Sequence, residues 1–181
     1  LSEASGRTAA EIGGKAGGLT RLIAAGFPVP DGVVVTAPAF AAVADAAELL
    51  GPLPDLERAT LDARYEHARA ALIDVPLPPA VDAELRDALP HLLADGGSVA
   101  VRSSATLEDS ATASFSGMLH TITGVTSARD AVDAVHQCWI SAFLPRVARY
   151  FAEKGCAPHD LLVAVVIQRQ IDAERSGLIF S

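Results

Sequence analysis

The spacing of apolar residues along the chain predicts an alternation of helices and strands. Several stretches repeat apolar residues at intervals of three and four, which is typical of amphipathic helices, and β-branched runs between them are typical of strands. The predicted helices cover residues 13–26, 38–50, 56–73, 79–93, 127–143 and 145–155. The predicted strands cover residues 32–36, 98–101, 118–125, 161–171 and 177–180. This pattern has no internal repeat and indicates a mixed α/β (α+β) fold.

The first predicted helix carries its apolar residues on one side. Leu19, Leu22 and Ile23 are spaced so that one face of the helix is expected to be buried. Gly26 is expected to end this helix, because glycine readily adopts the backbone conformation that terminates helices. Ser127 is expected to cap the start of the helix over residues 127–143.

Composition and charge restrict the class of protein. Half of the 181 residues are hydrophobic and 20% are charged, which is enough apolar material for one domain, or two small lobes of one, with a real core. The formal net charge of −8 argues against a nucleic-acid surface, which needs clustered Lys and Arg. The longest apolar run, residues 161–167, is too short to span a bilayer. We therefore expect neither a nucleic-acid partner nor a membrane segment.

The cysteines and the chain ends suggest where the protein works and how complete it is. Cys138 and Cys156 are too few for a disulfide framework and lack the spacing of a zinc site, so a reduced cytoplasm is the expected location. The chain starts at Leu1 rather than Met and stops directly after the apolar run 178–180. We interpret residues 1–181 as a fragment of a longer protein.

Residues 102–117 are a first candidate for anion binding. Eleven of these sixteen residues are Ser, Thr, Ala or Gly, and small side chains allow backbone N–H groups to approach an anion closely. Arg102, placed at the exit of a predicted buried strand, can offer a planar fork to phosphate oxygens. The alternative is a flexible surface loop with a structural arginine. Glu108 and Asp109 in the same stretch are either metal ligands or simply solvated acids.

A second candidate is the Gly-Gly-Lys sequence at residues 13–15. Its spacing differs from a Walker phosphate loop, which needs four residues between the first Gly and Gly-Lys and then Ser or Thr. Lys15 stands at a predicted helix start, where its charge opposes the helix dipole, so helix stability does not explain it. Lys15 therefore either reaches a nucleotide phosphate or is a solvated lysine on a glycine turn.

Gln168 and Gln170 end an otherwise apolar predicted strand and point to the same face. Buried amides need hydrogen-bond partners. The two side chains are expected to meet either a ligand edge or a neighbouring loop. Of the five histidines, only His120 lies near the proposed phosphate-binding stretch, with structural packing as the alternative role.

Taken together, these stretches resemble the N-terminal nucleotide-binding domain of the dikinase family, which includes phosphoenolpyruvate synthase, pyruvate phosphate dikinase, rifampicin phosphotransferase and the glucan water dikinases. The matching pieces span nearly the whole chain, in family order. They are Ile12-Gly-Gly-Lys-Ala, Gly26-Phe-Pro-Val-Pro-Asp-Gly-Val-Val-Val-Thr, Val99-Ala-Val-Arg-Ser-Ser-Ala-Thr-Leu-Glu-Asp, Ala113-Ser-Phe-Ser-Gly, Cys138-Trp-Ile-Ser-Ala-Phe, Val166-Ile-Gln-Arg and Ser176-Gly-Leu-Ile-Phe-Ser.

The resemblance implies the N-terminal lobe of an ATP-grasp-like domain, with a mixed sheet and flanking helices. It implies that Lys15 and Arg102 contact ATP phosphates and that Gly117 and Thr121 lie on a phosphate-covering loop. It also places Gln168 beside the nucleotide near a hinge, with backbone groups around Gln170 reading the adenine edge. Every residue role in this set comes from the resemblance.

The resemblance further implies partners outside residues 1–181. The Mg²⁺ ligands are expected on a second ATP-binding lobe, and a phosphoryl-carrying histidine on a separate domain beyond it, so this portion alone is not expected to be active. Met118, Leu119 and His120 replace the polar residues that usually follow Gly117, and Gln170 replaces a hinge methionine. The alternatives are therefore an antibiotic kinase similar to rifampicin phosphotransferase and a degenerate nucleotide- or partner-binding module without phosphotransfer.

Overall fold

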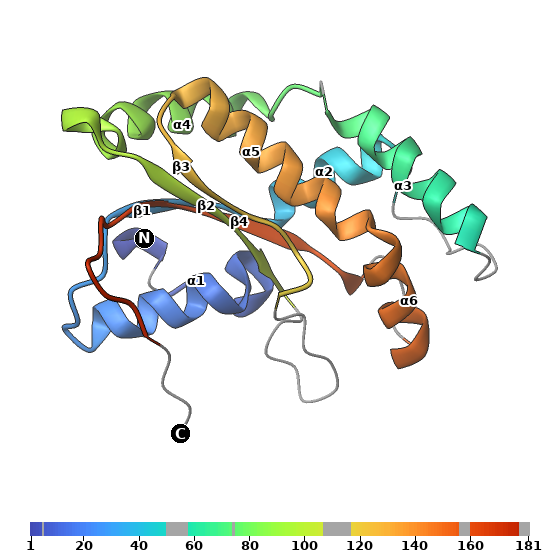
Figure 1. Ribbon diagram of the computed structural model, residues 1–181, viewed down its shortest axis with the longest axis horizontal. Helices are drawn as coiled ribbons and strands as arrows, with labels where there is room; N and C mark the ends of the chain where they lie inside the picture. Colours follow the sequence, from blue (N-terminus) through green and yellow to red (C-terminus); the bar gives the residue numbers. More distant parts are fainter. Residues whose placement is uncertain (5, 50–57, 74, 107–116, 156–159, 178–181) are drawn as a thin grey trace.

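A four-stranded sheet with helices on both faces organises the chain (Figure 1). The computed structural model describes residues 1–181 apart from 5, 50–57, 74, 107–116, 156–159 and 178–181. The strands are β1 (Gly32–Val35), β2 (Val99–Ala105), β3 (Thr121–Val125) and β4 (Val163–Arg169). They lie in the spatial order β1-β4-β2-β3.

Every pairing between these strands is antiparallel. The expected mixed sheet is therefore wrong for the described strands. Helices separate β1 from β2 in the sequence, a pattern that predicts a parallel crossover. β1 and β2 do run in the same direction, but β4 lies between them and pairs antiparallel with both. β4 thus occupies the position where a parallel pair between β1 and β2 would have formed.

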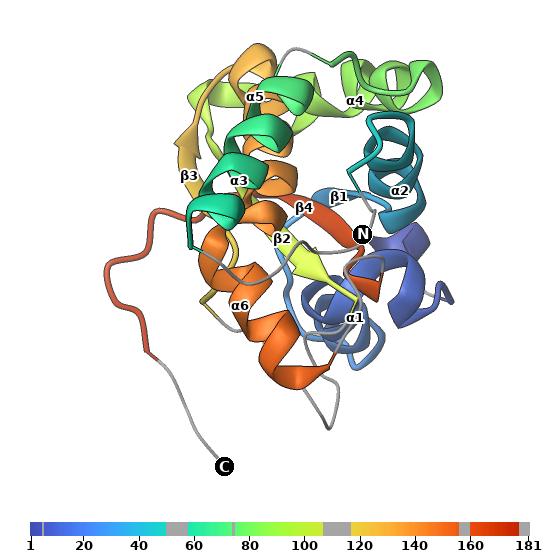
Figure 2. The same cartoon turned by 90° about the vertical axis from the view of Figure 1, so that its right-hand side faces the viewer.

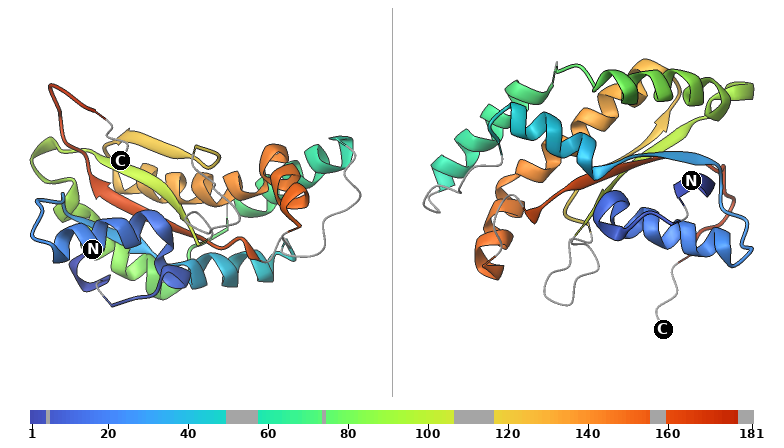
Figure 3. Two further views of the ribbon diagram at one scale, coloured as in Figure 1. Left: turned by 90° about the horizontal axis from the view of Figure 1, so that it is seen from below. Right: turned by 180° about the vertical axis from the view of Figure 1, so that it is seen from behind.

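The helices are divided unequally between the two faces of the sheet (Figures 1 and 3). α1 (Ala9–Ala24) covers one face, together with the short 3-10 helix η1 (Ser2–Ala4). The opposite face carries the other long helices, with α6 at one end. These are α2 (Ala37–Ala46), α3 (Arg58–Leu72), α4 (Pro79–Leu92), α5 (Ala128–Ile140) and α6 (Pro145–Lys154). Two further 3-10 turns are η2 (Ala94–Gly96) and η3 (Ser141–Phe143).

The main core lies between the sheet and the helices opposite α1. Trp139 is fully buried, and its ring centroid lies 6.0 Å from that of Phe40, which in turn lies 6.2 Å from that of Phe143. On the other face, Ile12 and Ala16 of α1 pack on Val166. Because both faces of β4 are covered, its first six residues are all buried. Burial on both faces explains why this strand reads as a continuous apolar run.

Glycine and capping residues mark several helix ends as predicted. Gly26 (φ 81°) follows the end of α1, and Gly155 (φ 66°) ends α6 in the left-handed conformation. Ser127 caps α5, where its Oγ accepts a hydrogen bond of 3.1 Å from the backbone N–H of Asp130. The predicted strand 177–180 and the break at residues 51–54 lie largely or wholly outside the described residues.

Several element boundaries differ from the predictions, and those of β3, α1 and β2 bear on the site. β3 begins at Thr121 rather than residue 118, because Met118 and Leu119 precede it and pack against the core instead. α1 begins at Ala9 rather than Gly13, since Glu11 accepts a 2.9 Å hydrogen bond from the backbone N–H of Thr8 and closes an earlier first turn. β2 extends to residue 105, four residues beyond its predicted end.

After β4, residues 170–177 leave the sheet as an exposed segment without regular structure (Figure 2).

No helix in the described part of the chain has both the length and the apolar character needed to cross a bilayer.

Candidate functional site

The path of α1 is fixed by an unusual backbone conformation at Gly13. Gly13 has φ 72° and ψ 173°, which interrupts the helix and starts a new helical segment directly after it. A side chain cannot be accommodated here, since a Cβ atom on Gly13 would lie 2.1 Å from the backbone oxygen of Ser104. The glycine thus allows the α1 backbone to contact β2 directly.

Ser104 holds the two elements together from the strand side. Its Oγ donates a 2.8 Å hydrogen bond to the carbonyl oxygen of Ile12 and accepts a 3.1 Å bond from the backbone N–H of Ala16. One buried hydroxyl therefore satisfies backbone groups on both sides of the break at Gly13. Lys15 lies between Ile12 and Ala16 in the sequence, so these two hydrogen bonds fix the position of its backbone relative to β2.

Arg102 reaches the same region from the strand. Residues two apart in a strand share a face, so Arg102 and Ser104 both lie on the side that α1 covers. On α1, residues at helical spacing, including Lys15, Leu19 and Leu22, line the same groove as Arg102. The groove between helix and strand has a volume of about 470 Å³ and is lined by Lys15, Gly18, Leu19, Arg21, Leu22 and Arg102.

Lys15 and Arg102, 87 positions apart in the sequence, are thus brought to one groove, as the nucleotide hypothesis requires.

The groove also explains a wrong prediction about α1. Leu22 was expected to be buried but is 43% exposed, because Ile12 and Ala16 make the contact with the sheet and the Leu19–Leu22 side turns to the groove.

The predicted strand end before Arg102 is also wrong. Arg102 lies within β2, paired with Val166 of β4 and Thr121 of β3. The Ser-rich sequence remains a strand because each hydroxyl finds a partner. The Oγ of Ser103 donates a 2.9 Å hydrogen bond to the carbonyl of His120, and Ser104 bonds α1. These partners are distant in sequence, so the local composition indicated a loop.

Thr121 and Gly117 lie on the β3 side of Arg102. Thr121 is the residue directly opposite Arg102 in the antiparallel pair, so the two side chains share a face of the sheet. Gly117 is exposed and has φ 73°, a conformation that suits glycine in the turn before β3. Glu108 and Asp109 lie outside the described residues.

The unusual segment Met118–His120 is held by contacts that sequence reasoning missed. Arg146 donates from Nε and Nη2 to the carbonyl oxygen of Met118, at 3.1 and 2.8 Å. The backbone N–H of His120 donates to Ser141 Oγ at 3.2 Å. Burial, and secondarily the charge of Arg146, lowers the pKa of His120. These contacts hold the backbone of the segment Met118–His120 against α6 and the turn that follows α5.

Gln168 and Gln170 both bond neighbouring backbone segments. The Nε2 of the nearly buried Gln168 donates a 3.0 Å hydrogen bond to the carbonyl of Pro30. The Oε1 of Gln170 accepts a 2.7 Å bond from the backbone N–H of Gly124. Neither glutamine lines the Lys15–Arg102 groove. The neighbouring-loop interpretation therefore accounts for these two side-chain contacts.

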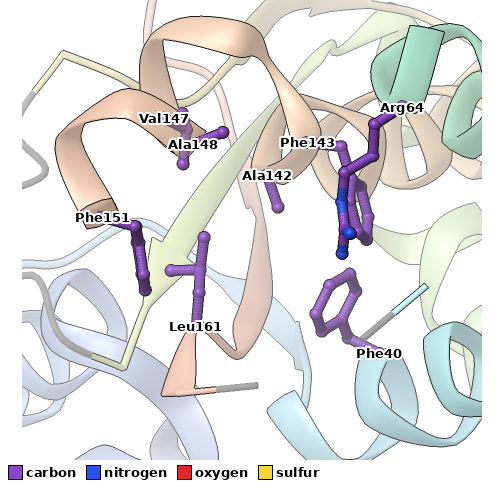
Figure 4. Close-up of a pocket in the computed structure, with 8 residues that line it drawn as sticks. All are labelled: Phe40, Arg64, Ala142, Phe143, Val147, Ala148, Phe151 and Leu161. Atoms are coloured by element: carbon purple, nitrogen blue, oxygen red, sulfur yellow. The ribbon is translucent and has the colours of Figure 1, made fainter. Parts of the chain in front are cut away.

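A second pocket lies on the other side of the sheet (Figure 4). It is mainly apolar and is lined by Phe40, Arg64, Ala142, Phe143, Val147, Ala148, Phe151 and Leu161. Its single cation is already engaged, since Arg64 Nη2 donates a 2.6 Å hydrogen bond to the carbonyl of Leu49. Burial lowers the pKa of Arg64. The pocket lacks the converging cations that a polyphosphate needs.

Two further observations concern metal and thiol chemistry. Among the described residues, no three His, Cys, Asp or Glu side chains are grouped closely enough to hold a metal ion. Cys138 is buried in the core, and desolvation raises the pKa of its thiol to about 12. We therefore assign Cys138 a packing role.

The arrangement of α1, β2 and the basic groove corresponds to a nucleotide-binding domain, and comparison with known proteins identifies the family. Residues 9–181 match the family described as the AMP/ATP-binding domain of pyruvate phosphate dikinase, and the chain belongs to this family.

Several curated proteins are similar to the chain over 94% of its length. A probable phosphoenolpyruvate synthase of Archaeoglobus fulgidus is 36% identical over 180 residues, and a phosphoenolpyruvate synthase of Aeropyrum pernix is 34% identical over 182. A prodigiosin synthesizing transferase, PigC, of Serratia marcescens is 35% identical over 171 residues. The chain spans 24%, 22% and 18% of these three proteins, respectively.

Proposed function

We propose that this chain is the N-terminal part of the ATP-binding domain of a phosphotransferase similar to phosphoenolpyruvate synthase, with an ATP-grasp-like fold. The observation that carries the proposal is the convergence of Lys15 and Arg102 on one groove. The two cations come from separate elements, and the Gly13–Ser104 contact fixes their relative position. Family membership supports ATP as the ligand.

The groove has the features that phosphate recognition requires. Lys15 provides a compact charge beside the start of a helical segment, where backbone N–H groups also favour anions. Arg102 provides a planar fork that can bind two phosphate oxygens at once. Phosphoryl transfer depends mainly on positioning and charge neutralisation, so these two residues are the proposed catalytic contribution of this chain.

The remaining site residues have subsidiary roles in the proposal. Thr121, opposite Arg102, and Gly117, in the preceding turn, belong to the segment that covers the phosphates. Gln168 lies beside the nucleotide and supports the Pro30 segment through its side chain. Backbone groups around Gln170 read the adenine edge. Family membership and the shared face of Arg102 and Thr121 support these assignments.

The rest of the reaction is proposed to take place on other domains. A second ATP-binding lobe supplies the Mg²⁺ ligands, and we assign no residue of this chain to the metal. A carrier histidine on a further domain accepts the phosphoryl group and delivers it to pyruvate or another small acceptor. This chain alone is then inactive. A cytoplasmic location belongs to the same proposal, because ATP is the substrate.

The proposal is tested by phosphohistidine formation in the intact protein. ATP labelled at its β- and γ-phosphates is expected to give an acid-labile phosphohistidine, and Lys15→Met or Arg102→Ala is expected to abolish most of the label. Bound ATP without any labelled histidine would instead support a nucleotide-binding module without phosphotransfer. The replaced residues Met118–His120 are the observation that favours this second candidate.

A further inference from the structure

We infer that Arg21 is a third phosphate-binding residue of the groove and gives it a preference for polyphosphates over monophosphates. The inference rests on the proposed function, since it assumes that the groove binds the ATP phosphates. Arg21 lies on α1 and lines the groove together with Lys15 and Arg102. The sequence pattern gave no reason to select it, because an isolated arginine on a helix is usually a solvated surface residue.

The Arg21 side chain folds back along the helix over two glycines. Its Nη1 lies 3.7 Å from the position that a Cβ of Gly17 would occupy, and its Nη2 lies 3.9 Å from that of Gly18. Gly17 and Gly18 precede Arg21 and follow Lys15, so the guanidinium is directed toward the lysine end of α1. Because neither glycine has a side chain, the guanidinium can lie close to the α1 backbone where that helix lines the groove.

Arg21 also differs from three arginines of this chain that are paired with carboxylates. Arg7, Arg69 and Arg86 each bond a carboxylate three or four residues away, with Glu11, Glu66 and Asp82 as their partners. Within the described part of the chain, Arg21 has no ion pair or hydrogen bond of its side chain to an acid. A guanidinium directed into a groove without a protein carboxylate is available for an anionic ligand.

The charge of the groove favours a polyphosphate. Three of its six lining residues are cations and none is an acid, although the chain as a whole has a net charge of −8. Such a local excess of positive charge attracts anions and is weakened by salt. A single phosphate can be bound by one or two of these cations, whereas a chain of phosphates can extend along α1 from Lys15 and Arg102 toward Arg21. The contribution of Arg21 therefore increases with the number of phosphates.

The test compares ligands of different phosphate number in the intact protein. Calorimetric titrations with ATP, AMP and inorganic tripolyphosphate are carried out on the unsubstituted protein, on Arg21→Gln and on Arg86→Gln. Arg86 is the matched control, because it lies on α4 across the sheet and its removal changes the net charge by the same amount. Circular dichroism checks that both variants are folded.

The expected result is a loss of binding affinity that differs between the three ligands. Arg21→Gln weakens binding of ATP and tripolyphosphate by about three- to tenfold, as for a partly exposed charge contact, and weakens AMP by less than about twofold. Arg21→Lys restores part of the loss, and Arg86→Gln leaves all three affinities unchanged. The loss also shrinks as the salt concentration is raised.

The failures of the two proposals give different results. If Arg21→Gln binds ATP and tripolyphosphate as tightly as the unsubstituted protein, while Arg102→Ala weakens both, the inference about Arg21 is wrong and the proposed function stands. If the unsubstituted protein binds neither ATP nor tripolyphosphate, the proposed function fails and the inference fails with it. An equal loss for AMP and ATP would contradict the preference for polyphosphates.

Discussion

Replacing Gly13 by alanine tests whether the contact between α1 and β2 builds the site. Gly13 has φ 72° and ψ 173°, a region of backbone conformation that is essentially restricted to glycine. A Cβ atom at this position would also lie 2.1 Å from the backbone oxygen and 2.5 Å from the Oγ of Ser104. Gly13→Ala must therefore change the backbone of α1, move β2 away, or both.

The loss of stability in Gly13→Ala can be estimated from the backbone conformation and from the steric contact with Ser104. An unfavourable backbone conformation of this kind costs about 1–3 kcal/mol. Separating the elements also weakens the two hydrogen bonds of Ser104, to Ile12 and Ala16, each with a net contribution of about 1 kcal/mol. We expect Gly13→Ala to lower the free energy of unfolding by about 3–5 kcal/mol and to weaken ATP binding, because Lys15 moves with the helix.

Gly26→Ala, just after the end of the same helix, is the matched control. Gly26 has φ 81°, but a Cβ atom there has no atom within 4 Å, so the substitution incurs only the backbone term of about 1 kcal/mol. Urea unfolding measures both variants, with the fluorescence of the buried Trp139, the single tryptophan of the chain, as the probe. Equal losses for Gly13→Ala and Gly26→Ala would refute the reasoning, because steric contact with Ser104 would then contribute nothing.

Three further predictions concern individual side chains. Ser104→Ala is expected to lower the free energy of unfolding by about 1–3 kcal/mol in urea titrations, because it leaves buried backbone groups of α1 without their partner; a neutral result would contradict this. Arg102→Ala is expected to weaken ATP binding by about 1–3 kcal/mol in calorimetry, and unchanged affinity would give the arginine a structural role. Burial raises the pKa of Cys138 from 9.0 to about 12, so the unfolded chain loses the thiol proton at lower pH than the folded chain. The free energy of unfolding should then fall by about 1 kcal/mol per pH unit above about pH 9. Urea titrations at about pH 8 and pH 10 should show a smaller fall for Cys138→Ala than for the unsubstituted protein, and an equal fall would contradict the prediction.

The helices and most strands could be predicted because their signals are local. Ser127, Gly26 and Gly155 act within one helical turn, and the apolar run of β4 directly reflects its burial on both faces. The extension of β2 could not be predicted in this way. Its serines are stabilised by hydrogen bonds to His120 and Ile12, and a window of neighbouring residues contains no sign of either partner.

For the candidate site too, neighbouring residues in the sequence predicted less than contacts between distant residues. Lys15 and Arg102 line one groove, but pairing them as candidates depended on the family resemblance and not on their sequence spacing. Arg146, which holds the Met118 carbonyl, and Arg21, which lines the groove, had no distinguishing pattern. Arginines at exposed helical positions look alike in a sequence, and only their three-dimensional neighbours separate them.

The central claim, that Lys15 and Arg102 bind the same triphosphate, is tested most directly by a crystal structure of the intact protein with a non-hydrolysable ATP analogue. We predict phosphate oxygens within hydrogen-bond distance, about 3 Å, of both Lys15 Nζ and the Arg102 guanidinium. A triphosphate that contacts neither side chain, or one bound on the opposite face of the sheet, would contradict the account.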